Sequence, residues 1–339
     1  MSTLRDARSS PWRLLLNRWS LQLAATVGLV AFALGRVDPR EALNAISQAD
    51  YGWSVAALAT LTGSKLLAAA RWRLYLKKVG RPPLLGLMGA YVIGTMVNTL
   101  LPLRSGDFAK IQIIAARYHL PRAAISSSVF AVEAVLDALT LLLLFLISMA
   151  ILDLDFIPDA IVFLFIAGVG GGFLAAVLTS RFMPHEMPAW RWLAFLNPRA
   201  REILAEAWPK FLDGMVTLRD GRLFVQAMSL HVIEWLMRAA VLGLLSASFA
   251  LDVEPTTYVI LTIAVAIFTL FPVTFFNIGT YQVVVTEIMV ASGASRDDAF
   301  AFAIASHAIS HLWIVVMGLS AAVLMQVRRH EISADTMAG

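Results

Sequence analysis

Long apolar runs separated by short polar segments fill most of the chain. Apolar runs of about 18 residues or more predict helices that span a membrane. Six runs of this kind predict one span each, over residues 14–35, 51–70, 125–152, 161–179, 223–251 and 300–325. Because spans and short connections use nearly the whole chain, we expect an all-α, polytopic membrane protein with one transmembrane domain over residues 1–339.

Two further apolar runs, 84–120 and 258–292, are each interrupted by proline and glycine. We interpret each as a re-entrant hairpin of two half-helices. This interpretation places the lysine and arginine groups around residues 5–18, 71–81, 117–122 and 181–222 on one face, which is the face that basic loops occupy in membrane proteins. The two hairpins then enter from opposite leaflets, which predicts an inverted repeat. We expect both termini on the cytoplasmic side of a bacterial or archaeal-type inner membrane.

Composition agrees with this assignment. Hydrophobic residues make up 59% and charged residues 15% of the chain, and the mean hydropathy is +0.75. Residues 181–222 form the longest polar connection, which is too short for a separate catalytic domain of about 100 residues. The basic residues flank apolar runs, so the membrane topology accounts for them and we expect no nucleic-acid partner.

Two segments allow more than one interpretation. The N-terminal basic region followed by residues 21–34 also fits a cleaved signal peptide, and we favour a retained first span. Residues 181–222 carry Trp190, Trp192 and Trp208 among charges, which is typical of amphipathic helices at the cytoplasmic interface and equally compatible with a solvated connector.

The first hairpin carries charges where hydrocarbon is expected. Arg104, Asp107 and Lys110 lie next to the break at Gly106. Charges inside a membrane segment are costly and indicate a functional site. A half-helix that begins at Gly106, and a second at Gly279, would direct free backbone N–H groups at an anion. Asp107 could cap its helix or pair with a neighbouring cation.

The next span carries Glu133 and Asp137, which are four residues apart and share one helix face. They could supply the counter-charge for Arg104 or Lys110, or act as a proton-coupling pair. They could equally form a structural salt bridge that attaches the hairpin to this span. The sequence leaves these alternatives open.

Other polar residues in apolar runs are candidates for gating or for a secondary polar network. His231, Glu234 and Arg238 lie on one helix face, and His307 and His311 are four residues apart. We expect interhelical hydrogen bonds rather than a metal site, because no third ligand is evident. Lys65 is expected to pair with a carboxylate or to extend to the interface, and Glu287 to contact a residue of the first hairpin.

The motif residues resemble a known family. Asn98, Pro102, Arg104, Gly106 and Asp107, followed by Glu133 and Asp137, resemble the transmembrane domain of lysylphosphatidylglycerol synthases and the stand-alone flippase-like proteins related to it. The segment Arg71-Trp72-Arg73 and the loop from Pro272 to Gly279 are also similar to family segments. The resemblance implies a substrate-binding role for the first motif, for Gly279 and for Gln282, and a gating or secondary role for Arg71.

Several positions depart from the family pattern. Phe275, Phe276 and Asn277 replace small residues, Gln282 stands where a glutamate is expected, and Ala134 replaces an arginine. The second motif is therefore degraded, and the preferred headgroup could differ. The soluble aminoacyl-transferring domain of the synthases is absent from this sequence, so the resemblance implies lipid translocation rather than lipid aminoacylation.

These observations predict a lipid flippase without a cofactor. Its cargo would be an anionic phospholipid or a polyprenyl-phosphate-linked lipid. Two alternatives remain: an accessory membrane subunit that holds a glycosyltransferase or lipid-modifying partner, and an intramembrane enzyme acting on lipid headgroups. The chain could also form a homo-oligomer.

Overall fold

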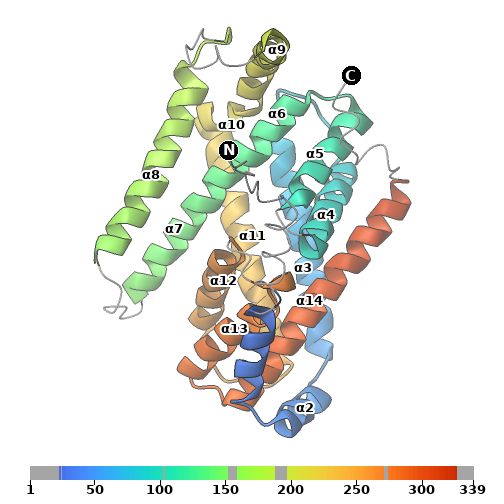
Figure 1. The fold of residues 1–339 in the computed structure, drawn as a ribbon, viewed down its shortest axis with the longest axis vertical. Helices are drawn as coiled ribbons and strands as arrows, with labels where there is room; N and C mark the ends of the chain where they lie inside the picture. The colour runs from blue at the N-terminus through green and yellow to red at the C-terminus, as the bar shows by residue number, and fades with distance from the viewer. Residues whose placement is uncertain are drawn as a thin grey trace, which may run out of the picture.

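A computed structural model describes residues 23, 25–101, 104–151, 159–187, 197–270 and 274–326. Within these ranges the regular elements are all helical, and Figure 1 shows them as one elongated bundle. After a helix at Ala25–Leu34, the α-helices are α2 (Pro39–Gln48), α3 (Gly52–Tyr75), α4 (Leu84–Leu100), α5 (Ser105–Tyr118), α6 (Arg122–Ser127), α7 (Ala134–Ile151), α8 (Asp159–Phe182), α9 (Pro198–Gly214), α10 (Val216–Arg219), α11 (Gly221–Ala247), α12 (Pro255–Leu270), α13 (Thr280–Ala291) and α14 (Arg296–Leu324).

Five helices are long and apolar enough to cross a membrane, and they confirm five of the six predicted spans. They are Gly52–Tyr75, Arg122–Ala150, Val162–Phe182, Gly221–Ala247 and Arg296–Leu324. The second of these joins α6 to α7 through a π-helical turn, Ser128–Glu133. The remaining predicted span, over residues 14–35, is the first along the chain, and only its later part lies within the described residues.

The first broken run forms the predicted pair of half-helices. α4 and α5 pack side by side, and each is shorter than the roughly 20 residues that a full crossing requires. The helices pack closely at Gly94 and Gly106, where a Cβ atom added to Gly106 would lie 1.8 Å from the Gly94 carbonyl oxygen. Pro102, at the tip, lies outside the described residues.

α12 and α13 form the second pair, and a 3-10 turn, Phe275–Asn277, precedes α13. Figure 1 shows α4 and α5 in one half of the bundle and α12 and α13 in the other half, as expected for hairpins that enter from opposite ends. α14 packs against both α4 and α13 and so connects the two halves. Contact between the hairpin tips, 102–103 and 271–273, stays a prediction.

The polar connector contains the predicted amphipathic helix. α9 packs against α6, while Ile203 and Leu204 on α9 are exposed. The Trp208 indole N–H donates to the Pro184 carbonyl, so this tryptophan attaches α9 to the segment after α8. Trp190 and Trp192 lie outside the described residues.

Candidate functional site

The break between α4 and α5 is held by the motif residues themselves. Arg104 adopts a left-handed backbone conformation, with φ 52° and ψ 34°, immediately before α5. The Asn98 side-chain oxygen accepts a hydrogen bond of 2.7 Å from the Gly106 N–H, and the Asn98 amide donates to Asp107 Oδ1 at 3.3 Å. Asn98 therefore caps the Gly106 N–H, which corrects the expectation that this group is free for an anion, and it also positions the carboxylate of Asp107.

Asp107 was predicted either to cap its helix or to pair with a neighbouring cation, and it pairs with two cations. Its Oδ2 accepts from Arg104 Nε at 2.9 Å, and its Oδ1 lies 3.2 Å from Lys110 Nζ. The capping role is wrong, because the side chain accepts no backbone N–H at the start of α5. The carboxylate of Asp107 is buried, while 66% of the Arg104 side chain is exposed. Arg104 is therefore the accessible end of this pair.

Lys110 connects the hairpin to the following span. Its buried ammonium group donates to Glu133 Oε2 at 3.0 Å and lies 4.9 Å from the centre of the Tyr91 ring. Tyr91 also donates its hydroxyl hydrogen to Glu133 Oε1 at 3.2 Å. Glu133 therefore provides the counter-charge predicted for Lys110, and the same contact attaches α5 to the next span.

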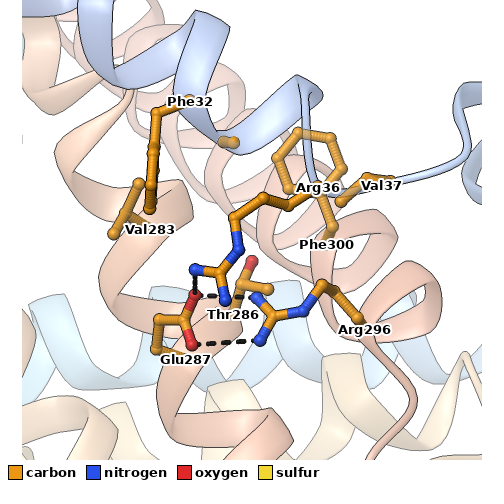
Figure 2. Close-up of a pocket in the computed structure, with 9 residues that line it drawn as sticks. Phe32, Arg36, Val37, Val283, Thr286, Glu287, Arg296 and Phe300 are labelled. Carbon is orange, nitrogen blue, oxygen red and sulfur yellow. Dashed lines mark hydrogen bonds and ion pairs between the residues drawn. The ribbon is translucent and has the colours of Figure 1, made fainter.

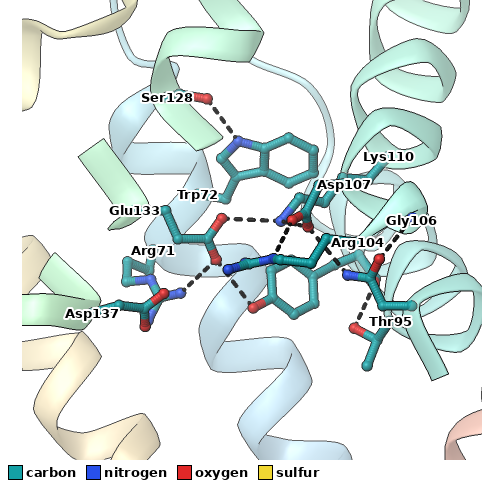
Figure 3. A network of polar contacts seen from close by, with 12 residues as sticks. Arg71, Trp72, Thr95, Arg104, Gly106, Asp107, Lys110, Ser128, Glu133 and Asp137 are labelled. Atoms are coloured by element: carbon teal, nitrogen blue, oxygen red, sulfur yellow. Dashed lines mark hydrogen bonds and ion pairs between the residues drawn. The ribbon is translucent and has the colours of Figure 1, made fainter. Parts of the chain in front are cut away.

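Arg71 lies at the centre of the polar network, where the sequence suggested only a secondary role. Figure 3 shows its side chain reaching toward Glu133. The guanidinium group donates to Glu133 Oε1 at 3.1 Å and to Glu234 Oε2 at 2.5 Å, and it also contacts His231 Nδ1. With 1% of its side chain exposed, Arg71 joins α3 to α11 and to the π-helical turn.

The network continues on the other side of Arg71. Glu234 Oε1 accepts from Arg238 at 2.6 Å, and His231 Nε2 lies 2.8 Å from Asp137 Oδ1. Arginine and tryptophan can only donate, so both ring nitrogens of His231 face a donor: Nδ1 faces Arg71, and Nε2 lies 3.1 Å from the Trp235 indole nitrogen as well as close to Asp137. Glu133 and Asp137 share a span but have different partners, which corrects the expectation that both face Arg104 or Lys110.

The ion pairs of this network balance in charge. The carboxylates are Asp107, Glu133, Asp137 and Glu234, and the paired cations are Arg71, Arg104, Lys110 and Arg238. Charge balance reduces the cost of burying these groups, and removing one member of a buried pair typically costs about 3–5 kcal/mol. We name these residues the charge network. It reaches the protein surface at Arg104, Asp137 and Arg238.

Lys65 is the exception to the balance. It lies on α3, as Arg71 does, and is 6% exposed. Among the described residues its ammonium group has no hydrogen-bond or ion-pair partner within bonding distance. No carboxylate in the described part of the chain pairs with Lys65, and extension of its side chain to the membrane interface stays a prediction.

The second hairpin lacks a comparable set of charges in the part that the structure describes. The Gln282 side-chain oxygen accepts from the Gly279 N–H at 2.7 Å, and its amide nitrogen lies 3.0 Å from His307 Nδ1. The Gly279 N–H is thus capped within the chain, which corrects the expectation that it is free for an anion. His311 Nδ1 lies 2.9 Å from the His307 carbonyl oxygen. These residues form a neutral polar cluster apart from the charge network.

Glu287 forms ion pairs with residues outside the first hairpin, where a partner was predicted. Figure 2 shows its carboxylate between Arg36 and Arg296, and Oε1 lies 2.7 Å from each guanidinium group. Phe32, Phe300 and these three charged residues line a small cavity of about 10 Å³. Glu287 therefore joins α13 to the start of α14 and to the end of the first apolar helix, and it does not contact the first hairpin.

Sequence reasoning missed the aromatic residues that surround the charge network. Trp72 donates its indole N–H to Ser128 at 3.0 Å, and its ring lies 5.7 Å from Lys110 Nζ. Tyr75 and Tyr91 are also buried beside Arg71 and Glu133. An available signal was the spacing of Arg71, Trp72 and Tyr75 at the end of an apolar run.

Comparison with known proteins identifies the family. The model of the "Lysylphosphatidylglycerol synthase TM region" matches residues 19–318. No curated protein and no solved structure matches the chain. The match supports a multi-pass membrane protein with a function related to membrane phospholipid. The chain belongs to the lysylphosphatidylglycerol synthase transmembrane-region family.

Proposed function

We propose that the protein moves an anionic phospholipid or a polyprenyl-phosphate-linked lipid across the cytoplasmic membrane. The observation that carries the proposal is the charge network beside the break in the first hairpin. A headgroup that crosses hydrocarbon must exchange its water for protein charges and dipoles, because an unsatisfied polar group costs several kcal/mol there. A balanced network with accessible members offers such an exchange.

Arg104 is the first contact for the headgroup. Its guanidinium group is exposed, charged and able to bind a phosphate with two N–H donors. The Asp107 carboxylate holds Arg104 in place while the site is empty. An incoming phosphate can replace Asp107 as the partner of Arg104, while Asp107 keeps its contacts with Lys110 and Asn98.

Exposed apolar side chains serve the hydrocarbon tails. Phe108 on α5, four residues after Arg104, and Phe130 in the π-helical turn are both exposed, and their rings lie 5.3 Å apart. A lipid can therefore keep its tails in the membrane while its headgroup contacts the charge network. This arrangement favours a carrier over an enzyme that must enclose its substrate.

A transport assay tests the proposal. The purified protein is reconstituted in vesicles, and the transbilayer movement of fluorescent anionic lipids is measured. Arg104→Ala and Asp107→Asn should each lower the rate roughly tenfold or more, since each removes a charge-assisted contact. Arg40→Ala on α2 removes an exposed arginine far along the chain from the network and should keep the parent rate. If all four proteins move lipid equally, the proposed site is wrong.

A further inference from the structure

A groove of about 420 Å³ lies between the α5–α6 connection and α9, and its lining includes no residue of the charge network. α9 contacts α6 closely at Gly214, where an added Cβ atom would clash with the Ala124 carbonyl oxygen. The α9 residues that line the groove, Ile203, Ala207 and Lys210, lie one to three turns before Gly214. The two helices therefore separate away from Gly214 and leave the groove between them.

Apolar walls and an excess of positive charge characterise this groove. Its charged lining residues are Arg122, Lys210 and Glu206, and the last two pair with each other at 2.6 Å. Within the described residues Arg122 donates to the neutral Gln112 side chain and contacts no carboxylate. The groove thus suits a segment that presents carboxylates beside apolar side chains. Its apolar walls include Ala115, Ala116, Leu120, Ile203 and Ala207.

The start of a long helix adds to the positive potential of the groove. The helix Arg122–Ala150 begins here, directly after Pro121, and no side chain of the described residues caps its first N–H groups. A helix start carries a partial positive charge, which favours a carboxylate at this position. The helix start therefore acts together with the Arg122 side chain.

The last described residues of the chain lie beside the same region. Arg117 Nη1 donates to the Met325 carbonyl oxygen at 2.7 Å, so the end of α14 is held against the last turn of α5. Ala116 and His119, next to Arg117, line the groove. Residues 327–339 follow Met325 and Gln326 and can span up to about 43 Å when extended. α5, which separates Met325 from the groove, is only about 10–12 Å wide. The segment is long enough to reach the groove.

The composition of this segment also matches the groove. Residues 331–339 carry Glu331 and Asp335 and no basic residue, and apolar side chains flank both acids. Two other segments outside the described ranges, 1–22 and 188–196, carry arginines and a single acid. Residues 152–158 are acidic, but they connect α7 to α8 at the other end of the bundle from α9 (Figure 1). Both the charge and the reach of residues 331–339 therefore fit the groove.

We propose that residues 331–339 bind in this groove as an intramolecular strap. The carboxylates of Glu331 and Asp335 face Arg122 and the uncapped helix start, and the apolar side chains pack against α5 and α9. Because α5 ends at the groove, the strap joins the base of the first hairpin and the end of α14 to α9. The inference does not depend on lipid transport.

Disulfide formation in the purified full chain tests the strap. The sequence contains no cysteine, so Thr336→Cys is combined with Ala207→Cys in the groove wall or with Ala205→Cys as the control. Positions 205 and 207 lie two residues apart on α9 and so face nearly opposite sides of the helix. Under mild oxidation the yield with Ala207→Cys should exceed the control roughly fivefold or more, because binding raises the effective concentration of position 336 at that face.

Charge reversal tests the role of the two acids. Glu331→Lys together with Asp335→Lys should lower the yield at position 207 to that of the control, and adding Lys210→Glu should restore part of it. Thermal midpoints equal to the parent's would establish that these variants are folded. A yield at position 207 that charge reversal leaves unchanged would overturn the assignment.

The same gels report the other possible occupants of the groove. Equal yields at positions 205 and 207 would overturn the strap. A disulfide-linked dimer on a non-reducing gel would place the segment of one copy in the groove of another and would overturn an intramolecular contact. The altered residues lie outside the charge network, so neither result depends on whether the protein transports lipid.

Discussion

Glu133 Oε2 accepts a hydrogen bond from Lys110 Nζ at 3.0 Å, and this contact joins α5 of the first hairpin to the next membrane span. Glu133 Oε1 also accepts from Arg71 on α3. One carboxylate thus holds three segments of the chain together. Replacing Lys110 or Glu133 alone should lower the stability of the protein. Replacing both together should cost less than the sum of the two single losses.

A double-mutant cycle on Lys110 and Glu133 measures this coupling. Lys110→Met and Glu133→Gln should each lower the free energy of unfolding, by up to about 3–5 kcal/mol, because each leaves the buried network with one excess charge, although Glu133 keeps Arg71 and Lys110 keeps Asp107. The double variant should lose less than the sum, by about 1 kcal/mol or more. Unfolding in detergent with increasing denaturant gives these values. Additive losses would show that the two side chains do not interact.

The close approach of Gly94 and Gly106 gives a second prediction. Gly106→Ala places a methyl group 1.8 Å from the Gly94 carbonyl oxygen, which forces α4 and α5 apart. We expect the free energy of unfolding to fall by about 3 kcal/mol, which is the upper end of the usual cost of overpacking. The rate of lipid transport should fall as well. Gly172→Ala is the matched control, because nothing lies within 4 Å of a Cβ at that position on α8. Equal thermal midpoints for both variants would contradict this close packing.

Glu41 on α2 should make the stability of the protein sensitive to pH. A hydrogen bond to Asp297 and the negative charges of Asp297 and Asp38 raise the pKa of Glu41 above 4.5. A carboxyl group with a raised pKa in the folded state contributes stability that is present below pH 4.5 and is lost as the pH rises through the folded pKa. The parent should therefore be destabilised relative to Glu41→Gln at neutral pH, and this difference should shrink on acidification.

Glu206 on α9 is the matched control for the pH experiment. A hydrogen bond from Lys210 lowers the pKa of Glu206 in the folded state. The stability that Glu206 contributes is therefore present above pH 4.5 and is lost as the pH falls through the folded pKa. The thermal midpoints of Glu41→Gln and Glu206→Gln should thus shift in opposite directions relative to the parent between about pH 4 and about pH 7. The same direction for both would contradict the assignment of Glu41.

The sequence allowed the helices to be predicted better than their contacts. Apolar runs determine the spans, and the interruption around Gly106 identifies the first hairpin, because both signals are local. The central position of Arg71 depends on α3, α11 and the π-helical turn meeting, which no spacing along the chain reveals. The contact of Glu287 with Arg36 was missed for the same reason, since Arg36 lies far from it in the sequence.

The second hairpin shows a different limit of prediction from sequence. The position of Gly279 before α13 suggested a free helix N-terminus, but Gln282 lies three residues later and its side chain reaches back to the Gly279 N–H. This is a local capping interaction that the sequence could have indicated.

Cysteine labelling measures most directly whether a lipid headgroup enters the first hairpin. The chain contains no cysteine, so a single one can be introduced at Phe108, an exposed apolar position one turn after Arg104 on α5. Leu174→Cys on α8 is an equally apolar and exposed control. The probe is a single-phosphodiester lipid with a thiol-reactive group on its head. Our account predicts that Phe108→Cys is modified faster than Leu174→Cys and that unlabelled lipid of the same charge suppresses the reaction. Equal labelling at both positions, unaffected by this competitor, would contradict it.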